Sequence, residues 1–129
     1  MTGGAQGLGL VCARALLEHG VSGLVIFDVD EECGARALEH LISLDWNYSF
    51  RARFFKVDVR DEESVDANVE DVCKRFWGVD ILLCFAGITD SKLAIEYPID
   101  SWRKIFDVNI NGCFLVARAV ARFSSFTVL

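Results

Sequence analysis

The chain has 129 residues, which suits one domain, and 53 % of them are hydrophobic against 25 % charged. This composition is typical of a globular protein and excludes a disordered or low-complexity chain. The net charge of −6 and the scattered Lys and Arg residues argue against a nucleic-acid partner.

No apolar stretch reaches the roughly 20 residues that a membrane span requires, because the most apolar one, 113–121, is broken by Arg118. No secretory signal precedes the first motif, so we expect a cytoplasmic protein without a membrane partner. The five cysteines (12, 33, 73, 84 and 113) are odd in number and form no C-x-x-C motif. They argue against a disulfide framework and a zinc site, and we expect no metal and reduced, mostly buried thiols.

Helical and strand-like segments alternate along the chain. Apolar residues at helical spacing predict helices at about 7–19, 31–44, 62–76 and 100–122. Short apolar runs predict strands at 24–27, 53–57 and 80–85. In the last helix we expect one apolar face, from Trp102 through Phe106 to Val116 and Val120. This alternation predicts an α/β fold with a parallel sheet, in which ligands bind beyond the carboxyl ends of the strands.

A glycine-rich turn, Thr2-Gly3-Gly4-Ala5-Gln6-Gly7-Leu8-Gly9, opens the first helix. Its glycines permit a tight turn and a close backbone approach to a pyrophosphate, and the helix N-terminus offers free N–H groups to anionic oxygens. We therefore predict cofactor contacts at Gly3, Gly7, Leu8 and Gly9. Glycine clusters also form ordinary turns, so this motif needs support from a second position.

Asp28 supplies that support, because it ends the next predicted strand about 20 residues beyond the turn. A carboxylate there can accept hydrogen bonds from both ribose hydroxyls of an adenosine, and its neighbour Val29 is predicted to border the same ligand. A 2'-phosphate would meet the charge of Asp28, and no Arg or Lys lies in the turn or directly after the strand, so NAD is expected rather than NADP. The alternative is a solvated loop acid beside Asp30 and Glu31.

Four landmarks occur in order: Thr-Gly-x-x-x-Gly-x-Gly at 2–9, Asp58-Val59, Ala86-Gly87-Ile88 and Val108-Asn109. Together they resemble the short-chain dehydrogenase/reductase family over residues 2–123, and most closely its polyol and sugar-alcohol dehydrogenases. The resemblance implies a Rossmann-type doubly wound parallel sheet. Here the sheet would be incomplete, with three strands and four helices but neither the first strand nor the C-terminal half. It also implies a partial NAD(P)-binding domain at 1–123 and a divergent tail at 124–129.

By this resemblance, Asp58 and Val59 border the adenine ring, and the backbone of Ala86 and Gly87 passes the cofactor. The chain departs from the family at Cys84 and Phe85, where two asparagines are expected, so the side-chain hydrogen bonds of those positions are in doubt. Core packing is expected of Phe85.

Asn109 matches the asparagine of the family's catalytic tetrad, which interrupts a helix so that a backbone carbonyl can hold a water. Its amide lies among apolar residues and would cost about 1 to 3 kcal/mol if it were left without partners. The alternative is a core asparagine bonded to neighbouring backbone.

The family's acid/base pair, Tyr-x-x-x-Lys, does not occur, since Tyr48 is followed by Ala52 and Tyr97 by Ser101. Only Met1 stands before the glycine turn, so we expect a gap in the sheet between 24–28 and 80–85. We expect a truncated or mis-spliced gene model, with a short natural isoform as the alternative. Its parent would transfer hydride between NAD and a secondary alcohol, polyol or ketone, and the chain itself would be inactive. The alternative is a non-catalytic nucleotide-binding module or one that forms a homo-oligomer through helix 100–122.

Overall fold

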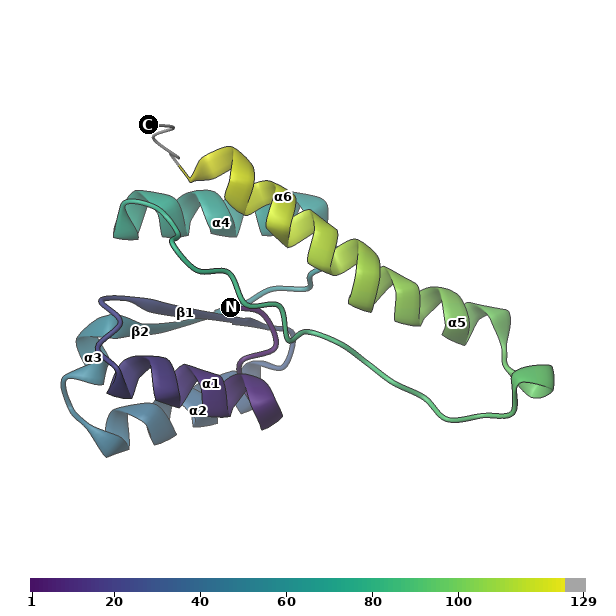
Figure 1. The fold of residues 1–129 in the computed structure, drawn as a ribbon, viewed down its shortest axis with the longest axis horizontal. Coiled ribbons are helices and arrows are strands. Elements are labelled where there is room, and N and C mark those ends of the chain that lie inside the picture. The colour runs from purple at the N-terminus through teal and green to yellow at the C-terminus, as the bar shows by residue number, and fades with distance from the viewer. Residues whose placement is uncertain (125–129) are drawn as a thin grey trace.

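A computed structural model describes residues 1–124 and has an α/β architecture with helices on both faces of a small parallel sheet (Figure 1). The strands are β1 (Leu24–Asp28) and β2 (Ala52–Lys56). The helices are α1 (Gly7–Glu18), α2 (Glu31–Leu44), α3 (Tyr48–Arg51), α4 (Glu62–Phe76), α5 (Ile99–Phe106) and α6 (Cys113–Phe123), with a 3-10 turn η1 (Ala94–Glu96) and a π-helical segment η2 (Asp107–Gly112). The predicted fold class is confirmed.

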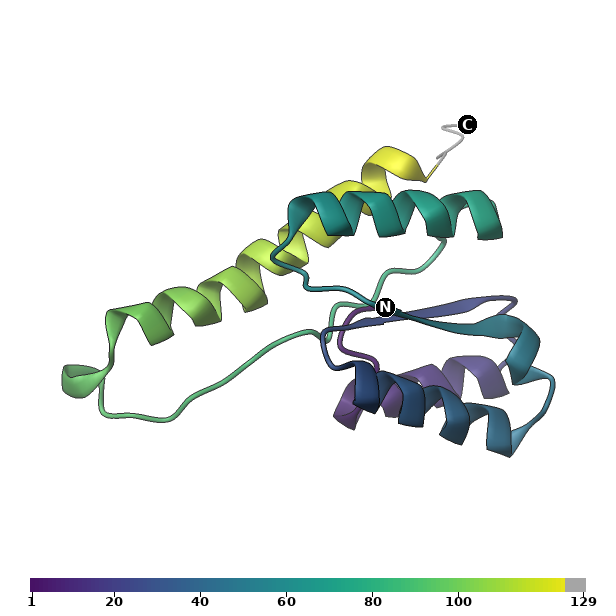
Figure 2. The same cartoon turned by 180° about the vertical axis from the view of Figure 1, so that it is seen from behind.

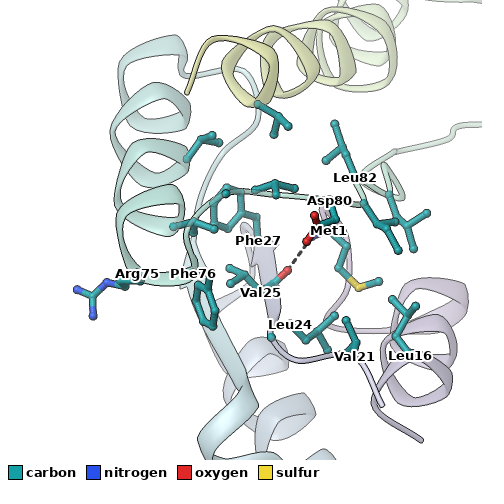
Figure 3. A pocket seen from close by; sticks show the side chains of 18 of the residues that line it. Met1, Leu16, Val21, Leu24, Val25, Phe27, Arg75, Phe76, Asp80 and Leu82 are labelled. Atoms are coloured by element: carbon teal, nitrogen blue, oxygen red, sulfur yellow. Dashed lines mark hydrogen bonds between the residues drawn. The ribbon is translucent and has the colours of Figure 1, made fainter. Parts of the chain in front are cut away.

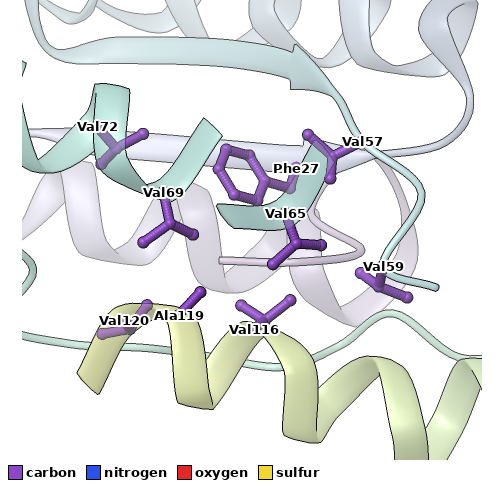
Figure 4. Close-up of a cluster of buried hydrophobic side chains, with 9 residues drawn as sticks. All are labelled: Phe27, Val57, Val59, Val65, Val69, Val72, Val116, Ala119 and Val120. Carbon is purple, nitrogen blue, oxygen red and sulfur yellow. The ribbon is translucent and has the colours of Figure 1, made fainter. Parts of the chain in front are cut away.

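The two strands pair in parallel, from Leu24 opposite Ala52 to Asp28 opposite Lys56. Successive side chains of a strand point to opposite faces, so each face has its own core. Leu24 and Ile26 pack beneath α1 and α2. Phe27 packs with the valines of α4 and with Val116 of α6 (Figure 4). The view from behind shows the same layers, with α4 and α6 on one side of the sheet and α1 and α2 on the other (Figure 2).

The predicted third strand at 80–85 is wrong as a continuous strand. Within residues 1–124 this segment has only a one-residue parallel bridge, between Thr2 and Cys84. Thr2 is also bridged to Phe27 of β1, so it stands between β1 and the 80–85 segment at the carboxyl end of the sheet. The Thr2 amide also donates to the Leu83 carbonyl at 2.9 Å, but residues 80–82 have no strand beside them in the part of the chain that the structure describes. An apolar run needs such a neighbour to form a ladder.

The predicted gap in the sheet is present as an apolar cavity of about 580 Å³ between β1 and residues 79–83 (Figure 3). Side chains of α1, α4 and α6 close its walls, among them Leu16, Val69 and Val120. The amino group of Met1 lies in the cavity and donates a hydrogen bond to the Val25 carbonyl at 2.7 Å. The cavity therefore occupies the place of a sheet strand.

The helix predicted at 100–122 is continuous in helical backbone but divides into α5, η2 and α6. Only its C-terminal part is buried, where α6 packs on α4 and is joined to it by Arg118–Glu62 and Arg122–Asp66 ion pairs. The expected apolar face is not buried as a whole. Trp102 and Phe106 are 51 % and 43 % exposed, because α5 extends away from the sheet (Figure 1).

Two other expectations need correction. None of the five cysteines is fully buried, and Cys84 and Cys113 are exposed. Little covers the 80–85 segment, which contains Cys84. Phe85, expected in the core, is 36 % exposed for the same reason. Of the predicted tail, Ser124 accepts a hydrogen bond from the Val79 amide at 3.1 Å, and 125–129 lie outside the described residues. Within 1–124 no helix is long and apolar enough to cross a membrane, and no cluster of three potential metal ligands occurs.

Candidate cofactor site

The glycine turn is held by close backbone packing at two of its predicted contact residues. Gly3 has φ +63° and lies so near Phe85 and Ala86 that a Cβ would come within 2.5 Å of the Ala86 nitrogen. A Cβ on Gly9 would overlap the Gly3 carbonyl oxygen. These two positions therefore require glycine, because a methyl group on Gly3 would overlap the 85–86 backbone and one on Gly9 would overlap the turn itself.

Gly7 is different, because its φ is +54° but a Cβ there would meet open space. It begins the 12-residue helix α1, whose N-cap residue Gln6 makes no side-chain capping bond. Leu8, in the same turn, is 77 % exposed. Gln6, Gly7 and Leu8 are all exposed, and the first turn presents free amides and the positive end of the helix dipole, an arrangement that fits an anionic phosphate.

Asp28 lies at the carboxyl end of β1, directly beside this turn. Its Oδ2 accepts a hydrogen bond from the Ala5 amide at 3.2 Å, and its Oδ1 accepts one from the Asp30 amide at 3.2 Å. The carboxylate is half-buried and thus fixed in position, while each oxygen keeps lone pairs for further donors. Val29, the next residue, is 60 % exposed at the same edge.

Asp58 and Val59 follow β2 at the neighbouring position of the edge. Val59 is buried against Gly112, whereas Asp58 lines a shallow cavity of about 470 Å³ with Arg60, Asp107 and Asn111. The Arg60 Nε donates to the Asp58 carboxylate at 3.0 Å, and this contact lowers the pKa of Asp58 below its ordinary value. Arg60 is not among the predicted site residues, although it stands only two residues after Asp58 in the sequence.

Thr2 joins the glycine turn to Ala86 and Gly87. It is 2 % exposed, its backbone bonds to Leu83 and Phe85, and its hydroxyl accepts a hydrogen bond from the Ala86 amide at 3.3 Å. Through Thr2, residues more than 80 positions apart form one edge. Thr2 is not among the predicted contact residues, although a hydroxyl beside a glycine turn is a usable signal in the sequence.

Asn109 lies in the π-helical segment, and its side chain faces Gly87. A Cβ on Gly87 would lie 3.4 Å from the Asn109 Oδ1. Its Oδ1 accepts a hydrogen bond from the Ile88 amide at 2.9 Å, and its Nδ2 donates to the Ile88 carbonyl at 3.0 Å. Around Asn109 the α-helical hydrogen-bond pattern changes to a π-helical one, while the backbone stays helical from α5 to α6. The paired bonds to Ile88 also match the alternative, an asparagine that serves neighbouring backbone, so the catalytic role stays a prediction.

The sequence profile of the family described as short chain dehydrogenase matches residues 1–125. The chain belongs to the short chain dehydrogenase family. An uncharacterized oxidoreductase of Thermotoga maritima is 33 % identical to it over 121 residues, which cover 94 % of this chain and 45 % of that protein. The 2-dehydro-3-deoxy-L-rhamnonate dehydrogenase (NAD(+)) of Sphingomonas sp. is 34 % identical over 128 residues, which cover 95 % of this chain and 46 % of that protein.

Among solved structures, NAD+-bound xylitol dehydrogenase matches with a TM-score of 0.79 and 26 % identity, over 95 % of this chain and 45 % of that one. The chain thus spans about half the length of the curated relatives it matches. The predicted contact residues meet at one edge, but the two tyrosines do not join them as an acid/base pair. Tyr48 is buried beneath α1 and α2, and Tyr97 stacks edge-on against Trp102.

Cys84 stands where a short chain dehydrogenase is expected to have an asparagine. Cys84 as a residue is exposed, but partial removal of its sulfur from water and contact with the Cys113 thiol raise the pKa of the Cys84 thiol to about 11. The thiol is therefore protonated at neutral pH, and its weak hydrogen-bonding capacity cannot replace that of an amide.

Proposed function

We propose that this chain binds NAD, in preference to NADP, and forms the nucleotide-binding half of an oxidoreductase of the short chain dehydrogenase family. The pyrophosphate would lie on the amides of Gly7, Leu8 and Gly9, and Asp28 would accept the ribose hydroxyls. Asp58 and Val59 would border the adenine, with Ala86 and Gly87 beside the rest of the cofactor. One observation carries the proposal: a carboxylate fixed by the Ala5 amide stands next to an uncapped helix N-terminus.

The charge of Asp28 supports the preference for NAD, because a 2'-phosphate at the same hydroxyl would be repelled. Two relatives carry NAD in their names, the rhamnonate-type dehydrogenase and the NAD+-bound xylitol dehydrogenase. Their names also fit the expected class of the whole protein's reaction, hydride transfer between NAD and a secondary alcohol, polyol or ketone.

Calorimetric titration of the chain with NAD and with NADP tests the cofactor preference. We expect tighter binding of NAD to the wild type, and an Asp28→Asn variant should lose most of the difference, because it keeps an acceptor oxygen but no charge. Asp30→Asn is the matched control, since it makes the same charge change two residues away and asparagine also serves as an N-cap. Tighter binding of NADP to the wild type, or an equal effect of the two variants, would contradict the proposal.

We further propose that the 129-residue chain has no dehydrogenase activity. Its tyrosines lack a lysine four residues later, and general acid/base catalysis contributes typically about 10²- to 10⁴-fold. The test follows NADH absorbance with secondary alcohols and polyols as substrates, beside a version extended with a family-like second half. Turnover by the short chain alone would show that another residue, with Asn109 first to be examined, moves the proton.

The alternative, a module that pairs with a second copy through helix 100–122, is favoured by one observation. Phe106, Ile110 and Phe114 are 43 %, 57 % and 61 % exposed on successive turns of the continuous α5–η2–α6 helix. Light scattering would show whether the chain is a monomer or a dimer in solution. A dimer that becomes monomeric in an Ile110→Glu variant supports pairing, whereas a wild-type monomer at high concentration excludes it.

A further inference from the structure

Lys56 stands beside the carboxylate on which the proposed cofactor preference depends. It is the last residue of β2 and the in-register partner of Asp28, the last residue of β1. Partners on neighbouring strands lie about 4.8 Å apart and point to the same face of the sheet. The structure thus puts a cation next to the proposed ribose site, where the sequence indicated none.

This cation is already engaged by another residue. The Lys56 Nζ donates to the Glu31 Oε2 at 3.1 Å, whereas the Asp28 oxygens accept from backbone amides. Glu31 is held in place as the first residue of α2, whose N-cap Asp30 accepts a hydrogen bond from the Cys33 amide at 2.9 Å. The Lys56 and Glu31 side chains are 58 % and 72 % exposed, so a ligand can compete for either.

We propose that Glu31 is a second residue that sets the cofactor preference, because it holds and neutralises Lys56 beside the place of a 2'-phosphate. The inference rests on the proposed NAD site at Asp28. With Glu31 present, a 2'-phosphate meets two carboxylates and a lysine that is already paired. Without the Glu31 charge, Lys56 is free to form a charge-assisted bond to the phosphate.

The test compares the dissociation constants of NAD and NADP for three variants of the full chain at low salt. Glu31→Gln should lower the dissociation constant of NADP about three- to ten-fold relative to that of NAD. Glu32→Gln is the matched control, because Glu32 carries the same charge one residue further and pairs with Arg36 at 3.3 Å instead of Lys56. The double variant Glu31→Gln, Lys56→Gln should lose most of the gain. The gain should also shrink in 0.3 M salt, since the pair is exposed.

Two results would overturn the inference in distinguishable ways. If the wild type binds NAD but Glu31→Gln and Glu32→Gln change the ratio equally, or the double variant keeps the gain, Glu31 has no specific effect on Lys56. If the wild type binds neither cofactor, the proposed site at Asp28 fails, and the role of Glu31 fails with it.

Discussion

The amino group of Met1 is a charge placed inside an apolar cavity, and this placement makes the stability of the 129-residue chain depend on pH. Burial, the larger cause, lowers the pKa of this ammonium from 8.0 to about 6, and the neighbouring Cys84 opposes the shift. The unfolded chain therefore binds more protons than the folded chain between pH 6 and 8. The free energy of unfolding should therefore rise as the pH rises from 6 to 8. It should fall as the pH is lowered again, because the buried amino group must then take up a proton.

The magnitude follows from the two pKa values. Their difference corresponds to roughly 3 kcal/mol of destabilisation, which is nearly complete below pH 6 and nearly absent above pH 8. Acetylation of Met1 removes the charge but leaves an N–H that can donate to the Val25 carbonyl, and the cavity of about 580 Å³ has room for the acetyl group. We expect the acetylated chain to be more stable than the unmodified chain by about 2 to 3 kcal/mol at pH 6 and nearly equal to it at pH 8.5.

Urea unfolding of both forms from pH 5.5 to 8.5 measures this difference. The comparison removes the contributions of the histidines and carboxylates, since both forms contain them. Parallel stability curves for the two forms would refute the reasoning, because they would place the Met1 amino group in water in both folded and unfolded states. A larger stability of the unmodified chain at pH 6 would show that its ammonium has an unrecognised partner.

Three further predictions concern the candidate site. Gly3→Ala should destabilise the chain by at least about 2 kcal/mol more than Gly7→Ala in urea unfolding, because both have positive φ but only Gly3 abuts backbone. Equal costs would contradict this. Arg60→Gln should raise the pKa of the Asp58 carboxyl toward its ordinary value in an NMR titration, since the guanidinium is the main cause of its lowering. Iodoacetamide should alkylate Cys84 more slowly at pH 8 in the native than in the unfolded chain, because its native thiol pKa is about 11; equal rates would show an unshifted thiol.

The sequence predicts those parts of the fold whose stabilising contacts are local. Helix α4 begins and ends where predicted, because Asp61 accepts a hydrogen bond from the Ser64 amide at its start and Val65, Val69 and Val72 recur at helical spacing. The 80–85 segment has an equally clear apolar pattern but forms no continuous strand. A strand depends on its neighbours in the sheet, and the pattern of a segment contains no information about them.

The same distinction applies to the candidate site. Asp28 and the glycine turn were predictable because their spacing along the chain is itself the signal. Lys56 and Glu31 were not, since 25 residues separate them and only the register of β1 and β2 brings Lys56 beside Asp28. Sequence spacing identified the carboxylate, but its electrostatic surroundings depend on strand pairing.

The candidate site keeps its shape although the sheet beneath it is incomplete, and Thr2 is the physical reason. Gly3 donates its amide to Phe27, while Thr2 donates to Leu83 and accepts from Phe85, so both sides of the gap are joined at the carboxyl edge. The gap itself opens toward the amino ends of the strands, where the cavity lies. Ligands of such sheets bind at the carboxyl edge. The gap therefore has two separate consequences. The apolar side chains around the cavity are less buried, which lowers the stability of the chain. The geometry around the glycine turn, Asp28 and Ala86 is nevertheless kept by a few backbone hydrogen bonds.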